Sequence, residues 1–173
     1  MTLDHIKSLI LDVPDFPKPG IVFKDITPLL SDASGFTSTI ARLAASVVDF
    51  EVDGLLAIES RGFIFGAALA QQFSMPLHLV RKSGRLPRDV ARVSYELEYG
   101  VEELEIHTDS IRAGGRYLII DDVLATGGTA AATARLVHDQ GGTVAACVFV
   151  IELAFLNGRQ ALGDCPVVSL ISY

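Results

Sequence analysis

The sequence predicts an α/β fold in which helices flank a central, mostly parallel β-sheet. Apolar runs without alternation, at 54–58, 117–120 and 143–151, are typical of strands buried on both faces. Segments with helical spacing separate these runs, and such recurrence of strand and helix indicates parallel strands joined by right-handed crossovers. The chain has 173 residues, of which 50% are hydrophobic, so we expect residues 1–173 to form one domain.

The composition and charge of the chain exclude several function classes. The formal net charge of −7 and the isoelectric point near 5.0 argue against a general nucleic-acid or membrane-surface binder, whose binding face would be basic. The N-terminus has acids and helical apolar spacing in place of a signal peptide, and no stretch has the length of a membrane span. We therefore expect a cytoplasmic protein with no nucleic-acid or membrane partner.

The cysteines and histidines do not indicate a metal site. Cys147 and Cys165 match no metal-ligand spacing, and each lies in an apolar run, so we expect both thiols to be reduced and buried. The histidines are scattered, and none falls in a ligand spacing: His5, His78, His107 and His138. We therefore assign no metal ligand to the protein itself.

The N-terminal segment combines a helical pattern with a stretch that excludes regular structure. Apolar spacing over residues 3–12 predicts an amphipathic helix. The residues that break it are Pro14, Pro17, Pro19 and Gly20. A short apolar patch at 21–23 follows, and by itself it indicates a loop that packs its aromatic residue onto the core.

The remaining elements follow from apolar spacing. Residues 35–50 have the pattern of a packing helix, and Ser34 is a candidate for its N-cap. Glycines break the chain after the helix that we expect to end at Gln140. The other expected elements are helices at 63–73 and 129–140 and strands at 54–58, 76–80, 117–120, 143–151 and 167–171.

The most informative stretch is YLIIDDVLATGGTAAA, residues 117–132. Its apolar strand ends on Asp121 and Asp122, at the edge where open α/β sheets bind ligands. The loop that follows has small residues and hydroxyls: Ala125, Thr126, Gly127, Gly128 and Thr129. Inward-facing N–H groups and the positive end of a following helix would hold a phosphate group there. Paired carboxylates beside it suit vicinal hydroxyls or a cation, and ribose 5-phosphate meets both requirements.

The segment IIDDVLATGGTA resembles the phosphoribosyl-diphosphate motif of the type I phosphoribosyltransferases. The resemblance implies that Asp121 and Asp122 contact the ribose hydroxyls and that the loop 125–129 holds the 5-phosphate. The alternative is an ordinary strand-to-helix turn capped by Thr126 or Thr129, with solvated acids.

A second strand end repeats this geometry at Ser60, Arg61 and Gly62. An arginine and a glycine that open a helix can bind an anion such as a diphosphate, although an arginine at a strand end often pairs with a nearby carboxylate. ESRGFIFGAALA resembles the diphosphate-loop segment of the adenine phosphoribosyltransferases. The resemblance places these three residues near the leaving group.

The segment VPDFPKPGIVFKDITPLL, within a hood at about 13–30, resembles the base-binding hood of the same family. The resemblance implies that Phe23 stacks on the base, with Val22 and Lys24 beside it, and that backbone groups read the edge of the base. An aromatic ring suits stacking on a flat purine.

A basic segment at 81–92 contrasts with the acidic chain. It contains five of the 14 basic residues: Arg81, Lys82, Arg85, Arg88 and Arg92. Gly84 and Pro87 exclude a continuous helix or central strand, so we expect a mobile basic loop, which together with a hairpin extends to about 108. A cationic flap would shield a reactive sugar cation from water, whereas the alternative is a solvated surface turn.

The hairpin is predicted by alternating residues at 93–100 and an antiparallel partner at 102–108. SYELEYG resembles the loop-closing strand of the adenine phosphoribosyltransferases. The resemblance gives Glu98 the role of handling the ring proton of the purine and places Tyr99 beside the closed loop. Glu96 has no such match, and we treat it as a surface residue.

Together these resemblances imply an enzyme that converts adenine and 5-phosphoribosyl 1-diphosphate to AMP and diphosphate. They also imply Mg²⁺ bound through the diphosphate, a homodimer, and basic groups that contact the donor, namely Arg81, which reaches the neighbour's diphosphate, with Lys82 and Arg85. Two alternatives remain open at this point. One is a phosphoribosyltransferase for hypoxanthine, guanine or xanthine, and the other is a non-catalytic regulator that senses the donor.

Overall fold

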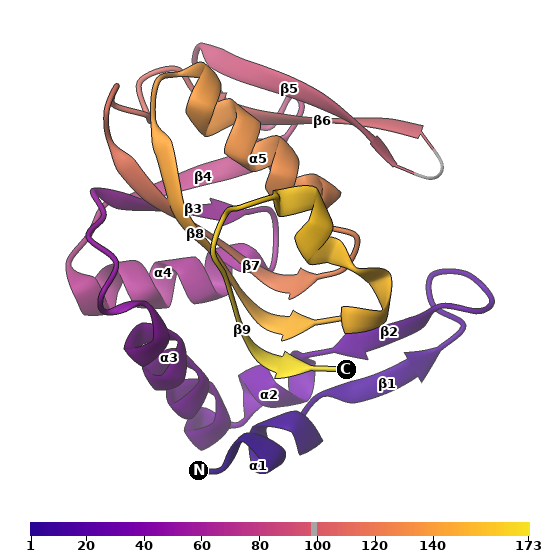
Figure 1. Cartoon of the computed structure of the whole chain (residues 1–173). Helices are drawn as coiled ribbons and strands as arrows, with labels where there is room; N and C mark the ends of the chain where they lie inside the picture. The colour runs from indigo at the N-terminus through magenta and orange to yellow at the C-terminus, as the bar shows by residue number, and fades with distance from the viewer. Residues whose placement is uncertain (98–99) are drawn as a thin grey trace.

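The computed structural model describes residues 1–97 and 100–173. Its main sheet contains strands β3 Gly54–Ile58, β4 Leu77–Lys82, β5 Val90–Leu97, β6 Gly100–His107, β7 Arg116–Leu124, β8 Thr143–Glu152 and β9 Val167–Ser172. These seven strands have the order β5-β6-β4-β3-β7-β8-β9. Strands β4, β3, β7, β8 and β9 are parallel, whereas β6 is antiparallel to both β4 and β5. The predicted α/β class with a mostly parallel sheet is confirmed (Figure 1).

The helices cover both faces of this sheet. They are α1 Leu3–Ser8, α2 Thr27–Ser31, α3 Ala33–Val47, α4 Gly62–Phe73 and α5 Gly128–Asp139, with short 3₁₀ helices η1 Ala154–Leu156 and η2 Gly158–Leu162. Helices α3 and α4 lie on one face and α5 on the other (Figure 1). The 3₁₀ helices were not predicted, because their three to five residues carry no apolar period that a sequence pattern can show.

The core divides into two layers because successive residues of a strand point to opposite faces. In β7, Leu118 and Ile120 pack with α3 and α4, whereas Tyr117 and Ile119 pack with α5. All five residues of β3 are buried. Burial on both faces explains why these strands appear in the sequence as continuous apolar runs.

The N-terminal prediction of a helix over residues 3–12 is wrong in its second half. Helix α1 ends at Ser8, and the chain then forms β1 Leu11–Pro14, which pairs antiparallel with β2 Val22–Asp25. The helical spacing is real, since Ile6 and Ile10 are both buried. Backbone pairing with β2, which is distant in sequence, decides the conformation of the residues after α1.

Three local predictions also need correction. Asp32, and not Ser34, caps α3, because its side chain accepts a hydrogen bond from the Gly35 N–H at 2.6 Å. Strand β7 continues past residue 120 to Leu124, since β8 pairs with it along this length. Cys147 is buried as expected, but Cys165 is only partly buried because it precedes β9 in a surface turn.

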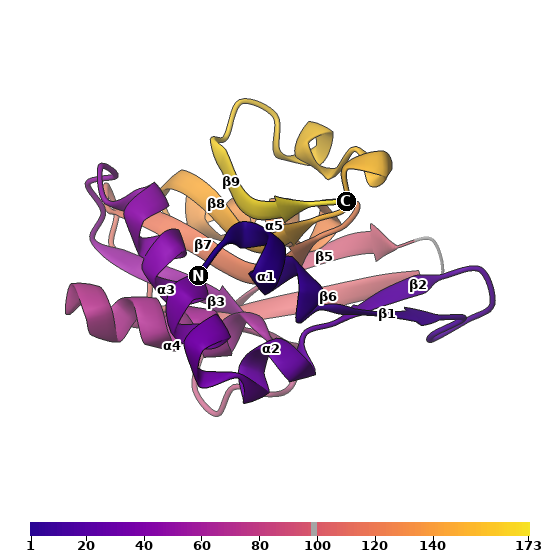
Figure 2. The ribbon, with the colours of Figure 1, turned by 90° about the horizontal axis from the view of Figure 1, so that it is seen from below.

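The basic segment 81–92 is a loop only in its middle. Arg81 and Lys82 belong to β4, and β5 begins at Val90, because both ends pair with β6. The β5–β6 and β1–β2 hairpins project past the same end of the main sheet (Figures 1 and 2). Within the described ranges, the structure contains no helix long and apolar enough to cross a membrane.

Candidate active site

The loop 125–129 connects the end of β7 to the start of α5. Gly127 is the N-cap of α5 and has a left-handed backbone with φ of +84°. No side chain makes a capping hydrogen bond to this N-terminus within the described part of the chain. The alternative in which Thr126 or Thr129 caps the helix is therefore not supported, and the first N–H groups of α5 remain available to an anion.

Asp121 and Asp122 lie inside β7 and close to the N-terminus of α4. Asp122 is 4% exposed, and its N–H donates a hydrogen bond to Asp121 Oδ1 at 2.9 Å. Burial raises the pKa of Asp121 well above its usual value, and the neighbouring Asp122 raises it further. Burial also raises the pKa of Asp122, although Arg61 opposes the shift. Burial thus disfavours the charged form of each carboxylate, and a hydrogen-bond donor on a ligand would stabilise that form.

Arg61 is the cation closest to these acids. Its Nε lies 2.9 Å from Asp122 Oδ2, which is an ion-pair distance. The buried oxygen nevertheless has no donor aligned for a hydrogen bond among the described residues, so the ion pair and the empty acceptor coexist. Arg61 therefore has the carboxylate partner that was one of its two predicted interpretations. The same position at the start of α4 is where the other interpretation places an anion site.

Gly62 allows the helix after Arg61 to approach β7. A Cβ atom at this position would lie 2.7 Å from the Ile120 carbonyl oxygen and 3.0 Å from Asp121 Oδ1. Any side chain would therefore push α4 away from the paired acids. Ser60 precedes this contact on the surface, and the Glu59–Ser60 peptide bond is cis.

The hood aromatic reaches the same place from the other side. The Arg61 guanidinium carbon lies 4.8 Å from the centre of the Phe23 ring, which also packs edge-on against Phe16 at 5.2 Å. Phe23 is partly exposed, and Val22 beside it is 47% exposed. The Lys24 side chain points away, because its ammonium pairs with Asp12 and lies 3.7 Å from the Tyr173 ring centre. Only the backbone of Lys24 is thus free to read a base.

Two of the basic residues predicted to contact the donor, Arg81 and Lys82, have acidic partners. Arg81 pairs with Glu59 through Nε at 3.2 Å and donates to the Arg85 carbonyl oxygen at 3.0 Å. Burial favours a higher pKa for Glu59, but Arg81 and the Lys82 N–H outweigh it and hold the pKa below its usual value. The Lys82 ammonium lies 3.3 Å from Glu102. Glu59 was not predicted, because nothing in the sequence marks it as the acceptor for a segment more than twenty positions away.

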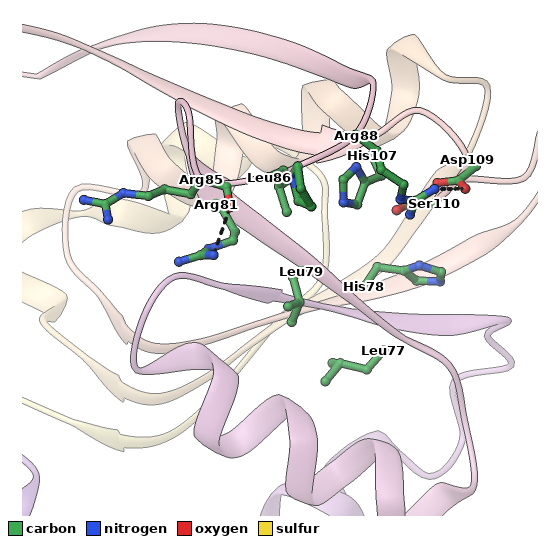
Figure 3. Close-up of a pocket in the computed structure, with 11 residues that line it drawn as sticks. Leu77, His78, Leu79, Arg81, Arg85, Leu86, Arg88, His107, Asp109 and Ser110 are labelled. Carbon is green, nitrogen blue, oxygen red and sulfur yellow. Dashed lines mark hydrogen bonds and ion pairs between the residues drawn. The ribbon is translucent and has the colours of Figure 1, made fainter.

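A pocket of about 510 Å³ lies beside these arginines (Figure 3). It is lined by β4, the following turn and the end of β6: Leu77, His78, Leu79, Arg81, Arg85, Leu86, Pro87, Arg88, His107, Asp109 and Ser110. Neither the acids of β7 nor the loop 125–129 contributes to it. The size of a cavity is thus not what identifies the site, and the convergence of polar groups around Arg61 is a better guide.

Tyr95 connects the hairpin to the loop, and sequence reasoning missed it. Its hydroxyl donates to Glu102 Oε2 at 3.0 Å and lies 3.3 Å from Thr129 Oγ1. Burial raises the pKa of this tyrosine, and the nearby Glu102 also raises it. Position 95 falls inside SYELEYG, which could have drawn attention to it. Glu98 and Tyr99, the residues chosen from that motif, lie outside the described residues.

A metal ion held by the protein itself needs a group of ligand side chains. Within residues 1–97 and 100–173 there is no group of three or more histidine, cysteine, aspartate or glutamate side chains arranged to hold a metal ion. The paired acids of β7 supply two carboxylates. A cation at this site would need further ligands from a bound molecule.

Comparison with known proteins identifies the class to which this fold and site belong. The family model described as the phosphoribosyl transferase domain matches residues 30–161, which is more than half of the chain. The chain is therefore a phosphoribosyltransferase by family.

The closer relatives define the family more narrowly. The adenine phosphoribosyltransferase of Geobacter metallireducens is 50% identical over 171 residues, which cover 99% of this chain and 100% of that protein. The crystal structure of the enzyme of that name from Thermoanaerobacter pseudethanolicus superimposes with a TM-score of 0.97 at 48% identity, covering 99% and 100% of the two chains. The adenine phosphoribosyltransferase of Saccharomyces cerevisiae was crystallised with adenine and an imino-altritol bisphosphate. Its structure superimposes with a TM-score of 0.90 at 36% identity, covering 97% of each chain. The chain belongs to the adenine phosphoribosyltransferase family.

Proposed function

We propose that this protein transfers a 5-phosphoribosyl group from 5-phosphoribosyl 1-diphosphate to adenine, forming AMP and diphosphate. One observation carries the proposal. The Arg61 side chain contacts both Phe23 and Asp122, so the hood aromatic, the acid pair of β7 and the start of α4 meet within the length of one side chain. The incoming base and the departing diphosphate meet at one carbon of the ribose, so the reaction needs these three surfaces side by side.

The reaction breaks the bond between the anomeric carbon and the diphosphate oxygen and forms a bond from that carbon to a ring nitrogen of the base. Positive charge develops on the sugar between these events, so the protein acts by holding the reactants in line and by stabilising charge. In this proposal Asp121 and Asp122 accept hydrogen bonds from the ribose hydroxyls. The N–H groups of the loop 125–129 bind the 5-phosphate, and Ser60, Arg61 and Gly62 bind the departing diphosphate.

The ring nitrogen that attacks must also lose its proton. We assign this proton to Glu98, with Tyr99 beside it, on the strength of the family motif SYELEYG. Phe23 stacks on the base, and the backbone of Val22 and Lys24 reads its edge. This assignment explains why a base site needs no acidic or amide side chain of its own among the hood residues.

The diphosphate brings Mg²⁺ with it as part of the donor substrate in this proposal. The acid pair of β7 fits such an ion, because carboxylate oxygens are the ligands it prefers and the donor would supply the rest. Arg81, Lys82 and Arg85 provide further positive charge around the diphosphate. We propose that two copies of the chain form a homodimer in the cytoplasm, with Arg81 of each directed at the neighbour's diphosphate, and that residues 1–173 act as one domain.

A base panel tests the proposal. Adenine, hypoxanthine, guanine and xanthine are each incubated with the donor and Mg²⁺, and nucleotide and diphosphate are measured. We expect AMP and equimolar diphosphate from adenine alone. Turnover of another purine without adenine would indicate a different base specificity, and donor binding without any turnover would indicate a sensor.

A further inference from the structure

The loop 125–129 rests on a segment that comes from the far end of the chain. After β8, residues 153–162 fold back over the end of β7, and the Leu153 N–H donates to the Leu124 carbonyl oxygen at 2.9 Å. This segment, called the brace here, contains η1 and η2. The Ala154 N–H in turn donates at 2.9 Å to the carbonyl oxygen of Tyr173, the residue directly after β9, so the brace is attached to the end of this strand as well.

The brace meets the loop by backbone contact at two glycines. A Cβ atom on Gly158 would lie 2.2 Å from the Ala125 carbonyl oxygen. A Cβ atom on Gly127 would lie 2.2 Å from the Gly158 carbonyl oxygen. At both glycines backbone faces backbone directly, so a displacement of the brace moves the backbone that carries the N–H groups of the loop.

Arg159 adds side-chain contacts to the backbone hydrogen bonds that hold the brace. Arg159 forms a two-pronged contact with Glu152, in which Nε and Nη2 each lie 2.6 Å from one carboxylate oxygen. Its remaining nitrogen donates to the Val167 carbonyl oxygen at 3.1 Å. Glu152 is 7% exposed at the end of β8, and Ser169 of β9 also donates to it. Arg159, with a smaller contribution from Ser169, holds the pKa of Glu152 below its usual value despite burial.

We propose that the Glu152–Arg159 pair is a positioning device for the phosphate loop, acting through Gly158. The proposal rests on the assignment of residues 125–129 to the 5-phosphate. The loop has no side-chain cap among the described residues, so its shape depends on what packs behind it. Arg159 connects that packing to two strands of the sheet, and this makes the register of the loop as rigid as the sheet.

Arg159→Met tests the pair, because methionine keeps much of the aliphatic length but cannot bridge to Glu152. We expect the Kd of 5-phosphoribosyl 1-diphosphate, measured by calorimetry with Mg²⁺, to rise about 10- to 100-fold, since N–H groups displaced by a fraction of an ångström bind phosphate poorly. The adenine KM and the kcat, both measured at saturating donor, should stay within about threefold. Under that condition the donor occupies the loop in the variant as in wild type, so weaker donor binding no longer affects either constant. Glu152→Gln should change the donor Kd in the same direction.

Arg159→Lys is the graded variant. A lysine keeps the charge but not the planar fork, so the donor Kd should lie between those of wild type and Arg159→Met. Arg112→Met is the matched control, because Arg112 pairs with Asp53 at 2.7 Å at the opposite end of the sheet. Its donor Kd should equal that of wild type even if its melting temperature falls.

The outcomes separate this inference from the proposed function. If wild type neither binds the donor nor forms AMP, the proposed function fails. If wild type does both and a folded Arg159→Met binds the donor normally with only a lower melting temperature, the pair is structural and the inference is overturned. Should Arg159→Met not fold, the folded Arg159→Lys decides the question by the same comparison of donor Kd with melting temperature.

Discussion

The hydroxyl of Tyr95 lies 3.3 Å from the hydroxyl of Thr129 and donates its own proton to Glu102. The Thr129 hydroxyl must therefore supply the proton between the two oxygens, since each hydroxyl has one. A hydroxyl with its proton directed at Tyr95 cannot donate it to a phosphate. If the loop 125–129 binds the 5-phosphate as proposed, hairpin strand β5 and that phosphate compete for the same donor at the start of α5.

Tyr95→Phe should separate the two proposed roles of the Thr129 hydroxyl, which are donation to Tyr95 and donation to a phosphate. The ring is kept, but the hydrogen bonds to Glu102 and to Thr129 are both lost, so the free energy of unfolding should fall by about 1 to 3 kcal/mol in chemical denaturation. The Thr129 hydroxyl becomes free, and the donor Kd should stay the same or fall by up to about threefold. Thr129→Val is the control, because it removes the hydroxyl itself and should raise the donor Kd about tenfold. An equal rise in both variants would mean that Tyr95 orients Thr129 for the phosphate.

Gly128→Val should weaken donor binding without unfolding the protein. A Cβ atom at this position would lie 3.7 Å from the Tyr95 ring, an ordinary contact distance, so the free protein can accept a side chain. The branched side chain would stand where N–H groups must face the phosphate, and the donor KM should rise about tenfold or more, with the adenine KM nearly unchanged.

Gly127→Ala is the contrasting variant for this loop. The φ of +84° at Gly127 and its contact with Gly158 leave no place for a Cβ atom, so the melting temperature of Gly127→Ala should fall as well.

Unchanged donor affinity in a folded Gly128→Val would contradict the assignment of the loop 125–129 to the 5-phosphate.

Asp121→Asn should make the protein more stable at neutral pH and less able to bind its donor. The pKa of Asp121 is raised in the folded state, so the folded protein binds more protons than the unfolded chain as pH rises above 3.8. The free energy of unfolding of wild type therefore falls as pH rises from 3.8 to the folded pKa of Asp121. Asparagine does not ionise, so the Asp121→Asn variant does not undergo this loss. Its Oδ1 can still accept from the Asp122 N–H, but it has no charge for the ribose, so the donor Kd should rise about 10- to 100-fold.

Glu105→Gln provides a control of opposite sign for this experiment. Burial favours a higher pKa for Glu105, but the Gly84 N–H, the Ser83 hydroxyl and Arg92 outweigh it and lower the pKa. Its charge therefore stabilises the fold above the unfolded pKa of 4.5 and is lost on acidification, so the variant should melt lower at neutral pH. Thermal melts of both variants from pH 4 to pH 8 check the two signs, and parallel curves would refute the argument.

Glu98→Gln tests the proton role that the family motif assigns. Glutamine keeps the size of glutamate but cannot exchange a proton, so the single-turnover rate should fall about 10²- to 10⁴-fold while both substrates still bind. Product release can mask this loss in steady-state kcat. Glu96→Gln, two positions earlier in the same motif, is the control and should be nearly neutral. Equal rates in the two variants would remove Glu98 from the mechanism.

The sequence by itself determined the parallel core and the place of the candidate site at the carboxyl ends of its strands. Continuous apolar runs such as that of β3 are buried on both faces, and polar residues that follow such runs lie near the carboxyl ends of the strands, as Asp121 and Asp122 do within the last residues of β7. Asp121, Asp122 and the loop 125–129 could therefore be proposed as a ligand site from local order, and the family motif supplied their expected roles. Arg61 could be placed at a second strand end for the same reason.

Only the tertiary structure decided which distant residues support these groups. Residues 9–14 carry a helical spacing that extends from α1, yet pairing with β2 makes Leu11–Pro14 a strand, because backbone hydrogen bonds to a distant segment outweigh a weak local preference. Glu59, Tyr95 and Arg159 look like ordinary surface residues in the sequence. Their roles depend on partners 22, 34 and 7 positions away, and such distances become contacts only when the sheet brings strand ends together.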